Sequence, residues 1–198
     1  MANISRITDR LWTGGDLPCH IGPDAMVADL ADITAAGITH IIDNRLEEDD
    51  GAFVAQHAPT VTYVWNGQDD AGQRMPDSWF DAGVEAALQA LAQPRTAVLS
   101  HCHMGINRGP SMAFAIMLAT GWAPAEALSA IRRARPIAAI YYSDNALDWW
   151  LRASDTPYVS ARRQLAELAL WHAHHPIDMV RVIRRERLAE LAGLPLGA

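Results

Sequence analysis

Cysteine is scarce in this sequence, and long apolar runs are missing. Only Cys19 and Cys102 occur among the 198 residues. Two cysteines do not make a disulfide framework, so we expect a chain that works in a reducing, cytoplasmic setting. No apolar run approaches the ~20 residues that a membrane-spanning helix needs. The first ten residues, MANISRITDR, are polar and unlike a secretion signal. We therefore expect neither a membrane anchor nor a membrane partner.

Basic residues are also in the minority. The chain has 16 Lys and Arg residues against 23 Asp and Glu residues, which gives a formal net charge of −7. Proteins that bind nucleic acid or polyphosphorylated lipids usually present a basic face. The charge therefore argues against a nucleic-acid partner. The sequence shows no internal repeat or low-complexity tract, and it leaves the oligomeric state open.

The hydrophobic pattern alternates between strand-like and helix-like segments. Such alternation is typical of an α/β fold with a central, mainly parallel sheet flanked by helices. Predicted strands lie at 10–13, 38–43, 61–65 and 96–101. Predicted helices lie at 24–36, 47–57, 77–92, 109–120, 124–134 and 144–153. Open sheets of this kind bind their ligands at the C-terminal ends of the strands.

The segment AVLSHCHMGINRGPS, residues 97–111, carries the strongest chemical signal. It joins a buried strand to a helix that has Pro110 in its first turn. Unpaired N–H groups and the helix dipole at such a junction favour a bound phosphoryl group. Gly105 lets the loop curl tightly, and Arg108 offers a planar fork to two oxygens. The same field lowers the pKa of a thiol below its usual ~8.5, so we expect Cys102 to be mostly thiolate at neutral pH.

The pattern His-Cys-x-x-Gly-x-x-Arg resembles the signature loop of the cysteine-dependent protein tyrosine phosphatase superfamily, most of all its dual-specificity branch. The resemblance covers about residues 4–152 and includes ISRITDRLWTGG and LADITAAGITHIIDN. It implies a dual-specificity phosphatase-like fold. It also implies hydrolysis of phosphomonoesters through a phosphocysteine intermediate, with no metal or other cofactor. The implied substrate is a phosphorylated protein, on phosphotyrosine and also on phosphoserine or phosphothreonine, or a small phosphomonoester.

The resemblance also assigns roles to individual residues. It makes Cys102 the nucleophile and Arg108 the phosphate clamp. The general acid falls on Asp70, in YVWNGQDDAGQRMPDSWFDAGVEAAL, when Trp79-Phe80 is placed on the family's aromatic pair. Asp69 is the alternative. The implied phosphate-binding residues are those of the loop: His103, Met104, Gly105, Ile106, Asn107 and Arg108.

One position departs from the family's pattern. The family usually has Ser or Thr directly after the Arg, where the hydroxyl stabilises the thiolate and helps it leave, whereas this chain has Gly109. Ser111, two positions later in the helix, is a weak substitute. We therefore expect a higher Cys102 pKa than in the family and slower breakdown of the phosphocysteine. His101 is expected to hold the loop carbonyls by hydrogen bonds.

Two other interpretations stay open. A phosphate-recognition or pseudophosphatase module would bind phosphorylated partners and turn over poorly because of Gly109. In addition, the tetrapeptide Gly-Ile-Asn-Arg resembles the loop of the RNA 5′-triphosphatases of the same superfamily. Those enzymes follow the Arg with Thr-Gly, which this chain lacks, so an RNA 5′-phosphatase is the less favoured alternative.

The remaining sequence predicts a catalytic domain at 1–154 and a helical extension at 155–198, packed on the same domain. Apolar residues at three- and four-residue spacing in RRQLAELALWHAHH and IDMVRVIRRERLAELAG predict two amphipathic helices. The arginines at 181–187 are interrupted by Glu186 and are typical of a solvated face. The histidines at 172–175 lack the spacing of a metal site. Asn145 is expected to brace the phosphate loop.

Overall fold

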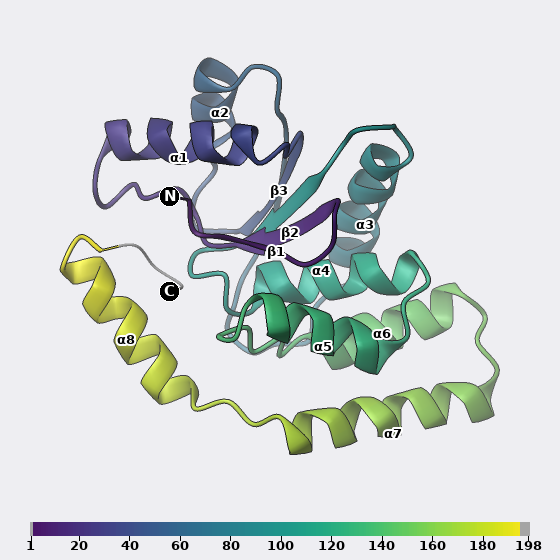
Figure 1. Cartoon of the computed structure of the whole chain (residues 1–198). Helices are drawn as coiled ribbons and strands as arrows, with labels where there is room; N and C mark the ends of the chain where they lie inside the picture. Colours follow the sequence, from purple (N-terminus) through teal and green to yellow (C-terminus); the bar gives the residue numbers. More distant parts are fainter. Residues whose placement is uncertain (1, 195–198) are drawn as a thin grey trace.

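The computed structural model describes residues 2–194. Its strands are β1 (Ile4–Arg6), β2 (Leu11–Gly14), β3 (His40–Arg45), β4 (Thr62–Gln68) and β5 (Val98–His101). Its helices are α1 (Pro23–Ala35), α2 (Gly51–His57), α3 (Asp77–Leu91), α4 (Arg108–Ala119), α5 (Pro124–Ala134), α6 (Ser143–Ala153), α7 (Tyr158–His174) and α8 (Met179–Leu191). The predicted α/β fold with a central sheet is confirmed (Figure 1).

The sheet places β5 at its centre. The strand order is β1-β2-β5-β3-β4, with β1 antiparallel to β2 and all other pairs parallel. Ser100 of β5 lies opposite Thr13 of β2 and Ile42 of β3. All four residues of β5 are buried. The chain that follows β5 therefore leaves the sheet at its C-terminal edge, between two neighbouring strands.

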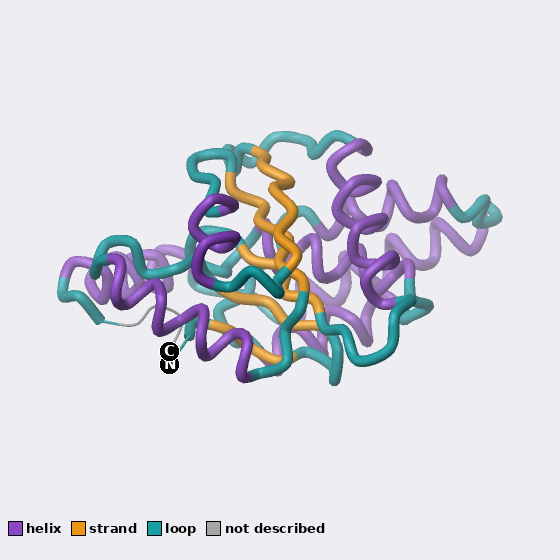
Figure 2. The backbone as a smooth tube through the Cα atoms, turned by 90° about the horizontal axis from the view of Figure 1, so that it is seen from above, coloured by secondary structure: helices purple, strands orange, loops and turns teal. Residues whose placement is uncertain are grey.

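Helices cover both faces of the sheet (Figure 2). On one face, α1 and α2 pack around a cluster that includes Leu30, Ile41 and Val54. On the other face lies α4, whose residues 108–118 are all buried. A helix that is apolar on every side, as MAFAIML is, must be covered all round, and α3, α5 and α6 do this here. The N-terminus of α4 is thereby fixed directly behind the end of β5.

The first C-terminal helix, α7, packs on α5 and α6. Trp171 Nε1 donates a hydrogen bond to Ser129 Oγ at 2.8 Å. His172 Nε2 lies 2.8 Å from Ser143 Oγ, and the ring of His175 stacks on Trp171. These two histidines therefore serve packing. Within residues 2–194, no three His, Cys, Asp or Glu side chains are grouped as a metal ion requires.

The second C-terminal helix, α8, returns towards the loop that follows β5 (Figure 1). Met179 and Val182 pack with Ile106 of that loop and with Ile137 and Ala139 behind it. The helix packs with one side only, since Val180 on its other side is 80% exposed, and this agrees with the predicted amphipathic pattern. Both predicted amphipathic helices are therefore present, and α8 brings apolar side chains to the end of β5.

One predicted helix starts later than expected. The prediction places it at 47–57, but α2 begins at Gly51. Residues 47–50 form a loop because two of their carboxylates pair with buried Arg45, which donates to Glu48 at 2.9 Å and to Asp50 at 2.5 Å. Pairing a buried guanidinium outweighs the weak helix propensity of four acidic or polar residues. Among the described residues, no helix is long and apolar enough to cross a membrane.

Candidate active site

The phosphate loop runs from His101, the last residue of β5, to Arg108, the first residue of α4. Gly105 sits at its tip with φ +64°, in the left-handed region that glycine adopts readily. A Cβ there would lie 2.4 Å from the carbonyl carbon of Gly14. Only glycine fits this position, both for its backbone angle and for the close approach of β2.

Buried donors hold the carbonyl groups of the loop on its outer side. Arg135, 1% exposed, donates from Nε to Gly105 O at 2.6 Å and from Nη2 to Met104 O at 2.8 Å. The N–H of Ala139 donates to Ile106 O at 2.7 Å. With these carbonyls engaged outwards, the loop is held in one conformation. The sequence pattern did not single out Arg135, which follows α5 directly.

Cys102 lies at the floor of the loop, 3% exposed. Burial raises the pKa of its thiol, against the lowering effects of the Arg108 charge and of hydrogen bonds from the Gly109 and Asn107 N–H groups. The groups that were predicted to lower the pKa of Cys102 are therefore present, but the prediction that this pKa is lowered overall is wrong. The reason is that complete removal of the sulfur from water penalises the thiolate more than these groups favour it.

Arg108 is held from the side opposite the thiol. Its two Nη atoms make a bidentate ion pair with Glu47, at 2.7 and 2.6 Å, and Nη1 also donates to Gln68 O at 2.8 Å. Arg108 in turn holds the pKa of Glu47 at about 2. Arg108 Nε is buried and makes no hydrogen bond within residues 2–194. Nε faces Asp70 Oδ2 at 3.5 Å without a hydrogen bond, so it is a donor that an anion in the cavity can use. Glu47 was missed in the sequence because it lies 61 positions before Arg108.

Asp70, in the loop between β4 and α3, reaches the same pocket. Its Oδ1 accepts hydrogen bonds from Asn107 Nδ2 and from the Tyr142 hydroxyl, both at 2.7 Å, and its Oδ2 lies 3.5 Å from Arg108 Nε. Burial and the Asp70 contact raise the pKa of Tyr142 to about 12, so this hydroxyl stays a donor. Asp69 instead accepts the N–H of Asp70 and does not line the pocket.

Three residues that were expected to support the phosphate loop or the thiol make other contacts: His101, Asn145 and Ser111. His101 Nε2 lies 3.6 Å from Asp43, and its Nδ1 makes no hydrogen bond in the described part of the chain, so Arg135 holds the loop carbonyls in its place. Asn145 accepts the N–H of Met75 at 2.7 Å and braces the chain after Asp70, not the phosphate loop.

Ser111 is also turned away from the thiol. Its hydroxyl accepts the N–H of Tyr142 at 3.3 Å and lies 3.5 Å from Asn107 Oδ1. It therefore supports Asn107, which in turn accepts the N–H of Tyr141 at 2.7 Å. This chain of contacts positions the side chain that holds Asp70, and it gives the thiol no hydroxyl partner.

His103, directly after the nucleophile, lies beside carboxylates. Its Nδ1 lies 2.6 Å from the buried carboxylate of Asp16, and this contact raises the pKa of the imidazole. Asp16 is shared with Arg45 at 3.3 Å. His103 Nε2 lies 3.9 Å from Glu190 of α8. The imidazole is thus flanked by Asp16 and Glu190, and these carboxylates offset the positive charge that its protonation brings to the site.

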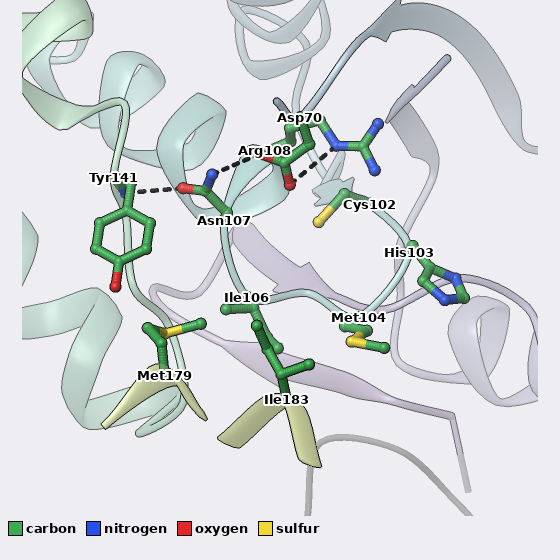
Figure 3. A pocket seen from close by; sticks show the side chains of 10 residues that line it. All are labelled: Asp70, Cys102, His103, Met104, Ile106, Asn107, Arg108, Tyr141, Met179 and Ile183. Atoms are coloured by element: carbon green, nitrogen blue, oxygen red, sulfur yellow. Dashed lines mark hydrogen bonds and ion pairs between the residues drawn. The ribbon is translucent and has the colours of Figure 1, made fainter. Parts of the chain in front are cut away.

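These groups line one cavity of about 250 Å³. Figure 3 shows Cys102, Arg108 and Asp70 on one side, with the apolar side chains of Met104 and Ile106 nearby. The structure thus brings all the predicted loop residues except Gly105 to the cavity wall. It adds three residues that the sequence did not identify: Tyr141, Met179 and Ile183.

The fold resembles solved phosphatase structures. PTPMT1 in complex with PI(5)P shares 19% identity over 76% of this chain and 99% of its own, with a TM-score of 0.59. Human DUSP28 shares 16% identity over 78% and 97%, with a TM-score of 0.59, and DUSP15 shares 21% over 83% and 95%, with a TM-score of 0.61. No protein-family profile matches the chain. On these likenesses and on its sheet topology, the chain has a dual-specificity phosphatase-like fold.

Proposed function

We propose that the protein is a phosphomonoester hydrolase that works through a phosphocysteine intermediate. One observation carries this proposal: the thiol of Cys102 and the guanidinium of Arg108, both on the phosphate loop, line a single cavity with the carboxylate of Asp70 from the loop between β4 and α3. A nucleophile, an anion clamp and a proton donor are the parts that phosphoryl transfer to a thiol requires. The phosphatase-like fold supports the same assignment.

In the first step, the Cys102 thiolate attacks phosphorus and the ester oxygen leaves with a proton from Asp70. Asp70 Oδ1 already accepts two hydrogen bonds, so the proton is carried on Oδ2. Arg108 holds the equatorial oxygens with N–H groups that its contacts to Glu47 and Gln68 leave free, Nε among them. Burial raises the pKa of Cys102, so desolvation opposes formation of the attacking thiolate, while the Arg108 charge and the Gly109 and Asn107 N–H groups favour it.

In the second step, water attacks the phosphocysteine and Asp70, now a carboxylate, takes the proton. Cys102 then leaves as a thiolate, stabilised by the N–H groups of Asn107 and Gly109. With Gly109 in place of the family's Ser or Thr, no side-chain hydroxyl assists this departure. We propose that breakdown of the intermediate limits turnover. The reaction as proposed uses no metal or other cofactor.

The substrate of the proposed reaction is a phosphorylated protein or a small phosphomonoester. Both cysteines are free thiols, which fits work in the reducing cytoplasm. An alternative function is phosphate recognition with little turnover. The raised pKa of Cys102 and the glycine at 109 favour this alternative, because both weaken the nucleophile while leaving the anion-binding loop intact.

Steady-state hydrolysis of phenyl phosphate in the presence of a chelator tests the proposal. Wild type should turn over without added metal, Cys102→Ser should not, and Asp70→Asn should be slower by about 10²–10⁴-fold. Asp69→Asn is the matched control and should retain most of the activity. If wild type is as inactive as Cys102→Ser while inorganic phosphate still raises its melting temperature, the enzyme proposal fails and phosphate recognition takes its place.

A further inference from the structure

The C-terminal helix α8 supplies part of the wall of the active-site cavity. Met179 and Ile183 are one helical turn apart, so both project from the same side of α8. Figure 3 shows the two side chains extending from this helix towards Ile106 and Tyr141. Packing of Met179 and Val182 on Ile106 fixes the helix to the phosphate loop itself. The wall is therefore built on the loop that would hold the phosphate.

This wall lies where the leaving group of a bound substrate would be. A phosphoryl group bound by Cys102 and Arg108 must direct its ester oxygen to Asp70, so the rest of the substrate extends into the outer cavity. The apolar and aromatic residues that line this cavity are Met104, Ile106, Tyr141, Met179 and Ile183. All five present apolar or aromatic surface to the group that leaves.

The charges around the cavity also select against a polyanionic leaving group. Glu47 is paired with Arg108, His103 is paired with Asp16, and Glu190 of α8 lies 3.9 Å from His103 Nε2. A second phosphate would meet hydrocarbon and carboxylates. An aromatic ring would bury apolar area, contact the Met179 sulfur favourably and pack against Tyr141.

We propose that α8 is the leaving-group wall of the site, and that Met179 and Ile183 select aromatic phosphomonoesters over alkyl and polyanionic ones. This inference rests on the proposed phosphomonoester hydrolysis. It assigns a specificity role to a segment outside the nucleophile loop and the acid loop. About a quarter of this chain has no counterpart in a neighbour such as PTPMT1, which is covered over 99% of its length by 76% of this chain.

The test compares kcat and KM for phosphotyrosine and phosphoserine in the full chain. Met179→Ala with Ile183→Ala should raise KM for phosphotyrosine about ten-fold, as expected for lost apolar contacts in a pocket, with kcat nearly unchanged. The constants for phosphoserine should change less than about two-fold. Val180→Ala is the matched control on the same helix, because Val180 is 80% exposed.

The possible results separate this inference from the function on which it rests. A selective rise in KM for phosphotyrosine supports the wall. If wild type hydrolyses phosphotyrosine in a Cys102-dependent way but the double variant behaves as Val180→Ala does, the wall is refuted and the hydrolase stands. Equal losses for both substrates also refute it, because they would indicate a structural role. No turnover by wild type on either substrate overturns both proposals.

Discussion

Replacing Gly109 by serine restores the residue type that related phosphatases carry, yet the structure predicts a loss. A Cβ at this position would lie 2.9 Å from both the carbonyl carbon and the Cα of His101, and 3.0 Å from Ser100 O. These are backbone atoms of β5, the buried central strand. Relief therefore requires β5 and α4 to move apart, since no side chain can rotate away.

The expected cost follows from two opposing contributions. Overpacking of a buried contact costs about 1–3 kcal/mol. Replacing glycine inside a helix returns roughly 0.5–1 kcal/mol through better helix propensity. The net destabilisation is about 0–2.5 kcal/mol, and its mid-range value of about 1 kcal/mol lowers the melting temperature of a chain of this size by about 2–4 °C. The same displacement moves the Gly109 N–H that donates to Cys102.

Gly109→Ala is the matched control, because it adds the same Cβ without the hydroxyl. We expect both variants to melt at similarly reduced temperatures in a thermal scan. We also expect Gly109→Ser to turn over no faster than Gly109→Ala on phenyl phosphate. A serine variant that melts at the wild-type temperature and turns over several-fold faster would refute this reasoning. It would show that β5 and α4 accommodate a side chain and that Gly109 is only a handicap.

Three further predictions address the groups around the loop. Because Arg108 holds the folded-state pKa of Glu47 at about 2, below the ~4.3 of an unfolded Glu, their pair contributes stability that is present above pH ~4.3 and is lost as the pH falls through about 2. Glu47 is about half exposed, so Glu47→Gln should cost only about 1 kcal/mol at pH 7 in urea titrations, and a gap that does not shrink below pH 4 would contradict the pairing. Since burial raises the pKa of Cys102, alkylation by iodoacetamide in a Cys19→Ser background should accelerate as the pH rises past 9, whereas a plateau below pH 7 would show a low pKa. Arg135→Met should destabilise by about 2–5 kcal/mol because two buried loop carbonyls lose their donor, and a cost under ~1 kcal/mol would mean that the loop holds its shape without it.

The sequence alone predicted the parts of the site that depend on local order. The strand before Cys102, the helix opened by Gly-Pro and the glycine at 105 act on neighbouring residues, so their pattern determines the loop. Asp70 was predicted over Asp69 from its distance to Trp79, which packs on Phe80 with ring centroids 4.9 Å apart. Both are buried and anchor the start of α3, which fixes the position of the preceding acid loop.

The contacts between distant segments could not be predicted in the same way. Glu47 falls within the helix predicted at 47–57, whereas buried Arg45 organises this segment as a loop. Asn145 looked like the brace of the phosphate loop, but that task falls to Arg135 and to the N–H of Ala139. The amphipathic pattern of α8 predicted that one side of the helix is apolar, but it did not indicate which surface of the protein this side contacts.

The central claim is that Cys102 becomes phosphorylated during turnover, and stopped-flow release of an aryl leaving group tests it most directly. If attack by Cys102 precedes a slow hydrolysis, wild type should release a rapid burst of about one phenolate per chain before the steady state. Cys102→Ser should show neither the burst nor the steady state. Phenolate release by Cys102→Ser at the wild-type rate would contradict the account, because the reaction would then proceed without the thiol.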